Sequence, residues 1–140
     1  QAFGAKIIAN DIVEKPHDFM APIETVLKEA DFVVLATDLN PTSQYIMNEK
    51  TVAQMKPTAY LINAARGPLV KEADIISALQ SGKIAGAAFD VFENEPLPED
   101  HPYRKMDNVI LSPHNSNSSL KAWERVHQNS VDQLFADLAK

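Results

Sequence analysis

Five residues with polar or charged side chains each follow an apolar run of this sequence: Asp11, Thr37, Arg66, Asp90 and His114. The guanidinium of an arginine can hold a carboxylate through two parallel hydrogen bonds, which a lysine cannot imitate. A histidine can move a proton at neutral pH. An aspartate at the end of a strand can accept hydrogen bonds from the hydroxyl groups of an adenosine ribose. Each of these residue types could contact a small acid or a nucleotide.

Two acids upstream of His114, Glu93 and Glu95, could orient its imidazole ring. A carboxylate partner favours the protonated form of a histidine. Each candidate also has a plainer interpretation. Arg66 could be a surface residue, Asp11 a loop acid, and the two glutamates solvating groups of an acidic loop. Taken singly, these residues leave both interpretations open.

A metal site is a third possibility for the acidic stretch. It would draw on Glu93, Glu95, His101 and His114, but their spacing matches no known ligand pattern. The chain has no cysteine, so a thiolate site is excluded as well. We therefore predict no metal, and we expect the remaining histidines to be solvated or to pack within the fold: His17, His101 and His127.

Apolar runs alternate with segments of helical periodicity, a pattern typical of parallel strands joined by crossover helices. Strands are predicted over residues 6–11, 31–36, 59–63, 84–89 and 108–111. An open, doubly wound parallel sheet follows, and such sheets bind ligands beyond the carboxyl ends of their strands. The five residues named first all occupy that edge.

The predicted helices connect these strands. The first has Pro22 in its first turn, the second covers residues 49–55 with Asn48 as its N-cap, and the fourth covers residues 120–138. A third helix of about ten residues ends at 81–82, where glycine suits the left-handed conformation. Its buried face is expected to carry Ala73, Ile76 and Leu79. Residues 92–107 contain three prolines and are predicted to be a loop.

Length and composition limit the classes of function. The 140 residues are enough for one domain, and 45% hydrophobic with 23% charged residues is usual for a globular protein. A net charge of −6 without a basic block argues against a nucleic-acid partner. No apolar run is long enough for a membrane helix, so we expect no membrane partner. The absence of cysteine fits a cytoplasmic location.

Three segments carry a resemblance to a known family. Residues 61–70 have the sequence LINAARGPLV, residues 81–98 have SGKIAGAAFDVFENEPLP, and residues 108–114 have NVILSPH. In this order they resemble the NAD-binding domain of the D-isomer-specific 2-hydroxyacid dehydrogenases, over essentially the whole chain. The resemblance implies a Rossmann-like α/β fold and transfer of a hydride between NAD and a small D-2-hydroxy acid or 2-oxo acid.

The resemblance also implies roles for individual residues. Arg66 would bind the substrate carboxylate and polarise its carbonyl, and His114 would be the acid/base. Glu95 would pair with His114 and stabilise the imidazolium. Among cofactor contacts, the family pattern places Asp11 on the ribose, which favours NAD over NADP. It places the other contacts along the dinucleotide and near the nicotinamide: Thr37, Ala64, Ala65, Arg66, Asp90, His114 and Asn117.

Parts of the family pattern are missing from this sequence. The glycine-rich loop, the first strand and the separate substrate domain have no counterpart, so residues 1–140 are expected to be a partial NAD-binding domain. We expect a fragment of a dehydrogenase about twice as long, inactive by itself. Loss of a central strand should expose apolar surface. A partner copy, a rearranged strand or a shifted helix would cover it, which suggests a homodimer.

A second class of function uses the same scaffold. The resemblance extends to NAD-dependent corepressors, which keep the arginine, glutamate and histidine and use NAD to control partner binding. The motifs do not separate such a binding protein from an enzyme. Oxidation of NADH in the presence of 2-oxo acids would do so.

Overall fold

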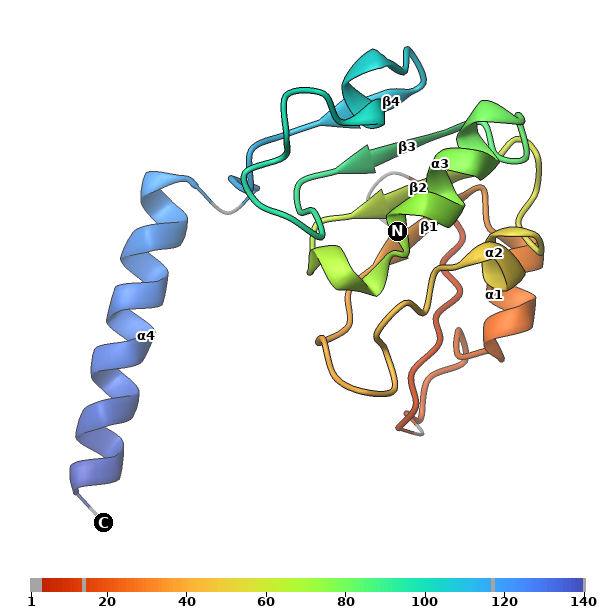
Figure 1. Cartoon of the computed structure of the whole chain (residues 1–140). Coiled ribbons are helices and arrows are strands. Elements are labelled where there is room, and N and C mark those ends of the chain that lie inside the picture. Colours follow the sequence, from red (N-terminus) through yellow and green to blue (C-terminus); the bar gives the residue numbers. More distant parts are fainter. Residues whose placement is uncertain (1–3, 14, 117, 140) are drawn as a thin grey trace.

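The computed structural model describes residues 4–13, 15–116 and 118–139. Its centre is a sheet of four parallel strands in the order β1-β2-β3-β4 (Figure 1). The strands are β1 Phe32–Leu35, β2 Tyr60–Asn63, β3 Gly86–Phe89 and β4 Val109–Leu111. Because all four run in one direction, the segments that follow them meet at one edge of the sheet. The predicted Rossmann-like α/β class is confirmed.

Three short helices accompany the sheet: α1 Ile23–Glu29, α2 Glu49–Val52 and α3 Glu72–Gln80. Single 3-10 turns cover Gly67–Leu69 and Pro102–Lys105. The core lies between α2, α3 and one face of the sheet, and Leu27 of α1 belongs to it. At its centre Leu61 and Ile75 are completely buried. Burial of this face is the main force that holds the domain together.

The two faces of the sheet differ sharply in burial. Val33, Leu61 and Ala87 are in register on the covered face. On the other face, Phe32, Val34 and Ile110 leave 64%, 59% and 72% of their surface exposed. The predicted apolar surface is thus present, and how it is covered stays a prediction.

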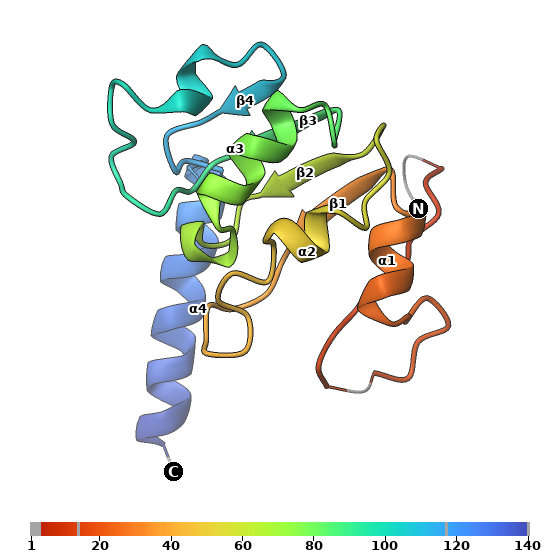
Figure 2. The same ribbon diagram turned by 45° about the vertical axis from the view of Figure 1, so that its right-hand side comes forward.

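Helix α4, Leu120–Leu138, has the bounds that the sequence predicts. Ser119 caps it by accepting the backbone N–H of Ala122, as a helix N-terminus requires. Figure 2 shows α4 extending away from the sheet. None of its residues is buried, although Trp123, Leu134 and Phe135 form part of an apolar stripe. Among the described helices, none combines the length and hydropathy of a membrane span.

The predicted strand over residues 6–11 is wrong. In its place the structure has one isolated bridge between Ala9 and Met20. Ala9 donates its N–H to Phe19 and accepts one from Ala21. A strand exists only where a neighbour continues the ladder of hydrogen bonds. The sheet ends at β1, so residues 6–11 have no such neighbour beyond this bridge.

Three smaller expectations about helices also need correction. Asn48 caps α2 as predicted, through Lys50 and Thr51, but the helix ends at Val52. Residues 92–107 are not all loop, since they contain the turn Pro102–Lys105. Pro22 is the N-cap of α1 and therefore precedes its first turn.

The buried face of α3 agrees with the predicted one only at Leu79. Its buried residues are Ile75, Ala78 and Leu79, while Ala73 is exposed and Ile76 is half-buried. Hydrogen bonds at the first turn of α3 join it to the start of α2 and to the segment that follows β3. These bonds set the rotation of the helix about its axis, which hydrophobic periodicity alone does not determine.

Candidate active site

The site is built from segments that follow β2, β3 and β4 at one edge of the sheet. Arg66 lies three residues after β2, Glu95 lies in the segment after β3, and His114 lies three residues after β4. Parallel registers hold the three strands side by side. Residues that are far apart in sequence therefore share the ligand-binding edge of the sheet.

His114 and Glu95 form a hydrogen-bonded pair. Nδ1 of His114 lies 2.7 Å from Oε2 of Glu95. The other oxygen of Glu95 accepts the backbone N–H of Phe92 at 3.0 Å. The hydrogen bond from His114, followed by that from Phe92, lowers the pKa of the Glu95 carboxyl. The pair leaves Nε2 of His114 available for a proton transfer outside it.

Asp90 holds the segment that carries His114. This aspartate is buried, and it accepts a short hydrogen bond from the Ser112 hydroxyl. Its two oxygens also accept the backbone N–H groups of Asn115 and Ser116, each at 2.9 Å. His114 lies between these anchors with a φ of 52°, a left-handed conformation that few side chains adopt without support. Asp90 supplies that support.

The charge state of Asp90 follows from the same contacts. Burial by itself raises the pKa of this carboxyl, but hydrogen bonds from Ser112, Ser116 and Asn115 outweigh it and bring the pKa far below the ordinary value. Asp90 is therefore a carboxylate at neutral pH. A permanent charge suits a structural acceptor better than a proton donor.

The loop of Arg66 is fixed by a buried side chain that motif reading did not single out. Asn63, at the end of β2, donates from Nδ2 to the carbonyl of Arg66 at 2.9 Å and accepts the N–H of Ala65 at 3.1 Å. Only 1% of Asn63 is exposed. The guanidinium of Arg66 is exposed, with Nη1 donating to the carbonyl of Ala65. A polar residue closing an apolar strand is the one signal for Asn63 in the sequence.

A cavity of about 320 Å³ adjoins the imidazole of His114. Its lining is mostly apolar, with Phe92, Leu97 and Leu111 beside the Glu95–His114 pair. A larger, shallow hollow of about 620 Å³ lies among residues 6–8 and 16–21. Glu95 and His114 line the smaller cavity and not the larger one, so we assign the site to the cavity at His114. Arg66 does not line this cavity and is placed at the same edge of the sheet by its position after β2.

The predicted cofactor residues fall into two groups. Thr37, Ala64 and Arg66 are exposed at the carboxyl edge, and Ala65 is half-buried there. Asp11 lies apart from the sheet, where its carboxylate accepts the N–H of Val13 and faces Lys15. Asn117 lies outside the described residues.

Glu93 does not share the imidazole of His114 with Glu95. Its carboxylate binds the backbone of Glu72 and the hydroxyl of Tyr45. His101, expected to be solvated or packed, faces Glu72 at 3.3 Å and packs against Tyr103. Within the described part of the chain, no three acids or histidines are grouped as metal ligands.

A parallel α/β sheet with a guanidinium and a histidine–carboxylate pair at its carboxyl edge defines a domain of the Rossmann-like dehydrogenase class. The model of the D-isomer specific 2-hydroxyacid dehydrogenase NAD-binding domain matches residues 1–116. The chain belongs to this family, as the sequence motifs imply.

Individual relatives agree with this assignment. Glyoxylate reductase of Thermofilum pendens is 39% identical over 98% of the chain and 42% of its own length. A D-isomer specific 2-hydroxyacid dehydrogenase from Lactobacillus delbrueckii ssp. bulgaricus, solved with NAD, is 38% identical with a TM-score of 0.85. It is matched over 99% of this chain and 47% of its own. The chain thus spans less than half the length of these two relatives.

A third relative shows variation in the cofactor. The NADPH-dependent glyoxylate/hydroxypyruvate reductase of Sinorhizobium meliloti is 32% identical with a TM-score of 0.80, over 84% of this chain and 64% of its own. The residues at this edge fit a dinucleotide, because Thr37 and Ala64 are exposed there with small side chains. The backbone of Ala65 is already in use, since its N–H binds Asn63 and its carbonyl binds Arg66.

Proposed function

We propose that this chain supplies the proton-transfer and carboxylate-binding residues of an NAD-dependent enzyme that interconverts D-2-hydroxy acids and 2-oxo acids. The Glu95–His114 pair is the observation that carries this proposal, because its 2.7 Å contact orients an imidazole at the ligand edge of a dinucleotide-binding sheet. The family match and the names of the relatives support the same reaction class.

Arg66 is proposed to bind the substrate carboxylate. Its guanidinium is exposed, and its backbone is fixed on both sides by Asn63. A guanidinium holds a carboxylate in a defined plane, which directs the adjacent carbonyl or hydroxyl group toward a fixed position. Its charge also stabilises the negative charge that develops on the carbonyl oxygen during reduction.

His114 is proposed to move the proton at Nε2. The neutral ring accepts the hydroxyl proton when a hydroxy acid is oxidised, and the protonated ring donates it when an oxo acid is reduced. Glu95 holds the ring by Nδ1 and stabilises its protonated form. Bound NAD supplies or accepts the hydride at its nicotinamide ring.

The cofactor contacts remain predictions. We propose that Thr37, Ala64 and Ala65 line the dinucleotide, and that Asp11 reaches its ribose. For Asp90 the predicted contact is the nicotinamide amide, yet its bonds to the His114 segment support a second role in holding that segment. For Asn117, which lies outside the described residues, contact with the cofactor stays a prediction.

The proposed function is tested by an activity assay on the full-length protein. We expect NADH oxidation with short 2-oxo acids, for which glyoxylate and hydroxypyruvate are the first candidates because relatives are named for them. Arg66→Ala and His114→Ala should each lower kcat/KM at least about a hundredfold. Asp107→Asn, at an exposed position before the start of β4 and thus at the opposite edge of the sheet, is the control and should retain full activity.

Glu95→Gln separates a catalytic pair from a structural one. Without the carboxylate the protonated imidazole is less favoured, so the acidic limb of the profile for hydroxy acid oxidation should move to lower pH. An unmoved limb would refute the role of Glu95. NAD binding without any turnover would instead favour the corepressor-like alternative. A homodimer and a cytoplasmic location stay predictions.

A further inference from the structure

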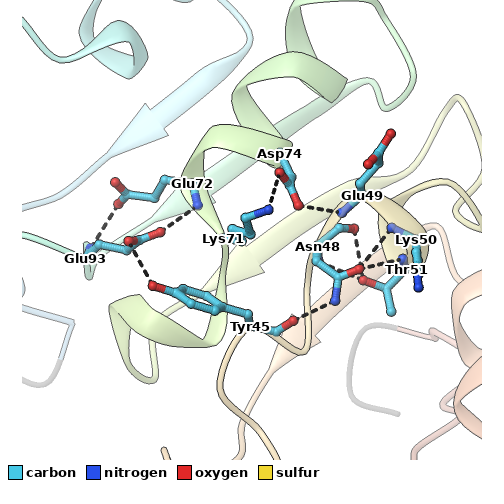
Figure 3. A network of polar contacts seen from close by, with 9 residues as sticks. All are labelled: Tyr45, Asn48, Glu49, Lys50, Thr51, Lys71, Glu72, Asp74 and Glu93. Carbon is cyan, nitrogen blue, oxygen red and sulfur yellow. Dashed lines mark hydrogen bonds and ion pairs between the residues drawn. The ribbon is translucent and has the colours of Figure 1, made fainter.

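Two glutamates hold each other's backbones at the base of the site. The N–H of Glu72, at the start of α3, donates to Oε1 of Glu93 at 2.7 Å. In return, the N–H of Glu93 donates to Oε1 of Glu72 at 2.9 Å. Figure 3 shows these two bonds joining α3 to the segment that follows β3. We call this arrangement the glutamate clamp (Glu72 and Glu93).

Both glutamates use their second oxygen as well. Oε2 of Glu93 accepts the hydroxyl of Tyr45 at 3.4 Å, and Oε2 of Glu72 faces Nε2 of His101 at 3.3 Å. Nδ1 of His101 accepts the N–H of Tyr103. The proton of a neutral ring is therefore on Nε2, the nitrogen that faces Glu72. Each carboxylate oxygen of the clamp thus has a polar neighbour, which restricts the motion of both side chains.

The clamp lies between the predicted catalytic residues. Glu93 is two residues before Glu95, whose carboxylate binds both Phe92 and His114. On the other side, Gly67 packs so closely on Phe92 that a Cβ at position 67 would overlap the Phe92 carbonyl. Gly67 directly follows Arg66. The Phe92–Glu93 backbone therefore sets the spacing between the loop of Arg66 and the Glu95–His114 pair.

Tyr45 joins a third segment to the same point. Its N–H donates to the carbonyl of Pro68, next to Gly67, while its hydroxyl reaches Glu93. The segments that follow β1, β2 and β3 are thus linked through one carboxylate. A link that only stabilised α3 against the core would not need to contact both the loop of Arg66 and the segment that carries Glu95.

We propose that Glu93, held by Glu72, is a positioning residue that fixes the Glu95–His114 pair relative to Arg66. The proposal rests on the proposed function for its catalytic meaning, but the geometry that it predicts can be measured without turnover. Neither glutamate of the clamp needs to touch substrate or cofactor.

Two conservative variants separate geometry from charge. Glu93→Asp keeps the charge but withdraws the carboxylate by one methylene from the Glu72 N–H. Glu93→Gln keeps the length and the acceptor oxygen but removes the charge. Asp74→Asn is the matched control. Asp74 also binds a backbone N–H, that of Glu49, in the part of the network in Figure 3 that does not touch Glu93.

The readout is the titration of the Glu95 carboxyl, followed by NMR in protein labelled with 13C at glutamate and assigned with Glu95→Gln. In Glu93→Asp the hydrogen bonds to the Glu95 carboxylate lengthen, so the midpoint of the Glu95 titration should rise by at least about 0.3 pH unit. In Glu93→Gln and Asp74→Asn this midpoint should stay within about 0.1 unit of the parent value. Glu93→Asp shortens the side chain by a single methylene, and circular dichroism checks that the variant is folded.

Two results would overturn the proposal. One is an unchanged Glu95 titration in folded Glu93→Asp, and the other is a shift in Glu93→Gln as large as that in Glu93→Asp. In the active enzyme, Glu93→Asp should also lower kcat for 2-oxo acids at least about tenfold, with recovery in Glu93→Gln. If no 2-oxo acid is turned over, the proposed function fails while the NMR result still decides the positioning role.

Discussion

Two stretches of the chain carry predicted ligand-binding residues, and they are held in very different ways. In residues 60–116, three strands, a helix and their loops are joined by a buried core and by side chains that bind backbone groups. In residues 4–31, Leu27 is the buried residue of the described positions, and 81% of Ile12 is exposed. Arg66, Glu95 and His114 fall in the first stretch, and Asp11 falls in the second.

This difference explains where a sequence motif predicts the position of a side chain. Asp90, Asn63 and the glutamate clamp fix the backbone around each catalytic candidate, so the motif predicts positions there. Among the described residues, the carboxylate of Asp11 accepts the N–H of Val13 in a local turn and lies 4.0 Å from the amino group of Lys15. A residue type in the right order predicts chemistry only where neighbouring residues hold it in place.

The largest expected contrast is between two phenylalanines on opposite faces of the sheet. Phe89 is 3% exposed and stacks on Tyr103, whereas Phe32 is 64% exposed. Phe89→Ala should lower the free energy of unfolding by about 3–5 kcal/mol because it leaves a cavity. Phe32→Ala should cost under about 1 kcal/mol. Urea unfolding of both variants tests this, and equal losses would show that the open face is covered in solution.

Gly67→Ala should have the next largest effect. The added Cβ meets backbone atoms of Phe92 and Glu93, which a side chain rotation cannot relieve. We expect a loss of at least about 2 kcal/mol in the free energy of unfolding. Gly82→Ala is a useful comparison, because position 82 is open but its φ is 69°. A loss at Gly67 no larger than at Gly82 would contradict the close contact between the Arg66 loop and residues 92–93.

Low pH should reduce the free energy of unfolding through Asp90, which lies in residues 60–116. Because the pKa of Asp90 is lowered in the folded protein, its contribution to stability is complete above the ordinary carboxyl value of 3.8. It is lost as pH falls from that value through the folded pKa. Asp90→Asn removes the charged acceptor and should cost about 1–3 kcal/mol at neutral pH. Unfolding curves of the variant should depend less on pH below about 4 than those of the parent, and parallel curves would rule out this assignment.

The smallest expected contrast is between two asparagines. Asn48 accepts N–H groups at the start of α2, and its loss in Asn48→Ala should cost about 1 kcal/mol. Asn10 donates to the carbonyl of Ala21 in the exposed first stretch, so Asn10→Ala should cost under about 0.5 kcal/mol. Thermal unfolding measures both. A larger effect at Asn10 would mean that residues 4–31 are held more firmly than their burial indicates.

Local signals in the sequence predicted much of the fold. The bounds of α4 follow from its apolar periodicity and its serine cap, and the strands that become β1 to β4 follow from apolar runs. Residues 6–11 also contain an apolar run but have no neighbour to complete a ladder, so they form no strand. Strand formation depends on the partner as well as on the segment.

The candidate site shows a similar division. The motif predicted that Glu95 faces His114, and the structure pairs them. It could not predict that Glu93 turns to Glu72, because residues two apart in a loop have no fixed relative direction. Asn63 and Ser112 were also missed, since a buried asparagine and a serine before a proline have many ordinary uses.

The most direct test of the site is a crystal structure of the protein with NADH and oxamate, an unreactive analogue of a 2-oxo acid. The geometry predicts that the oxamate carboxylate binds the guanidinium of Arg66 and that its carbonyl oxygen accepts a hydrogen bond from Nε2 of His114. Oxamate bound away from this edge, or His114 separated from Glu95 in the complex, would contradict it.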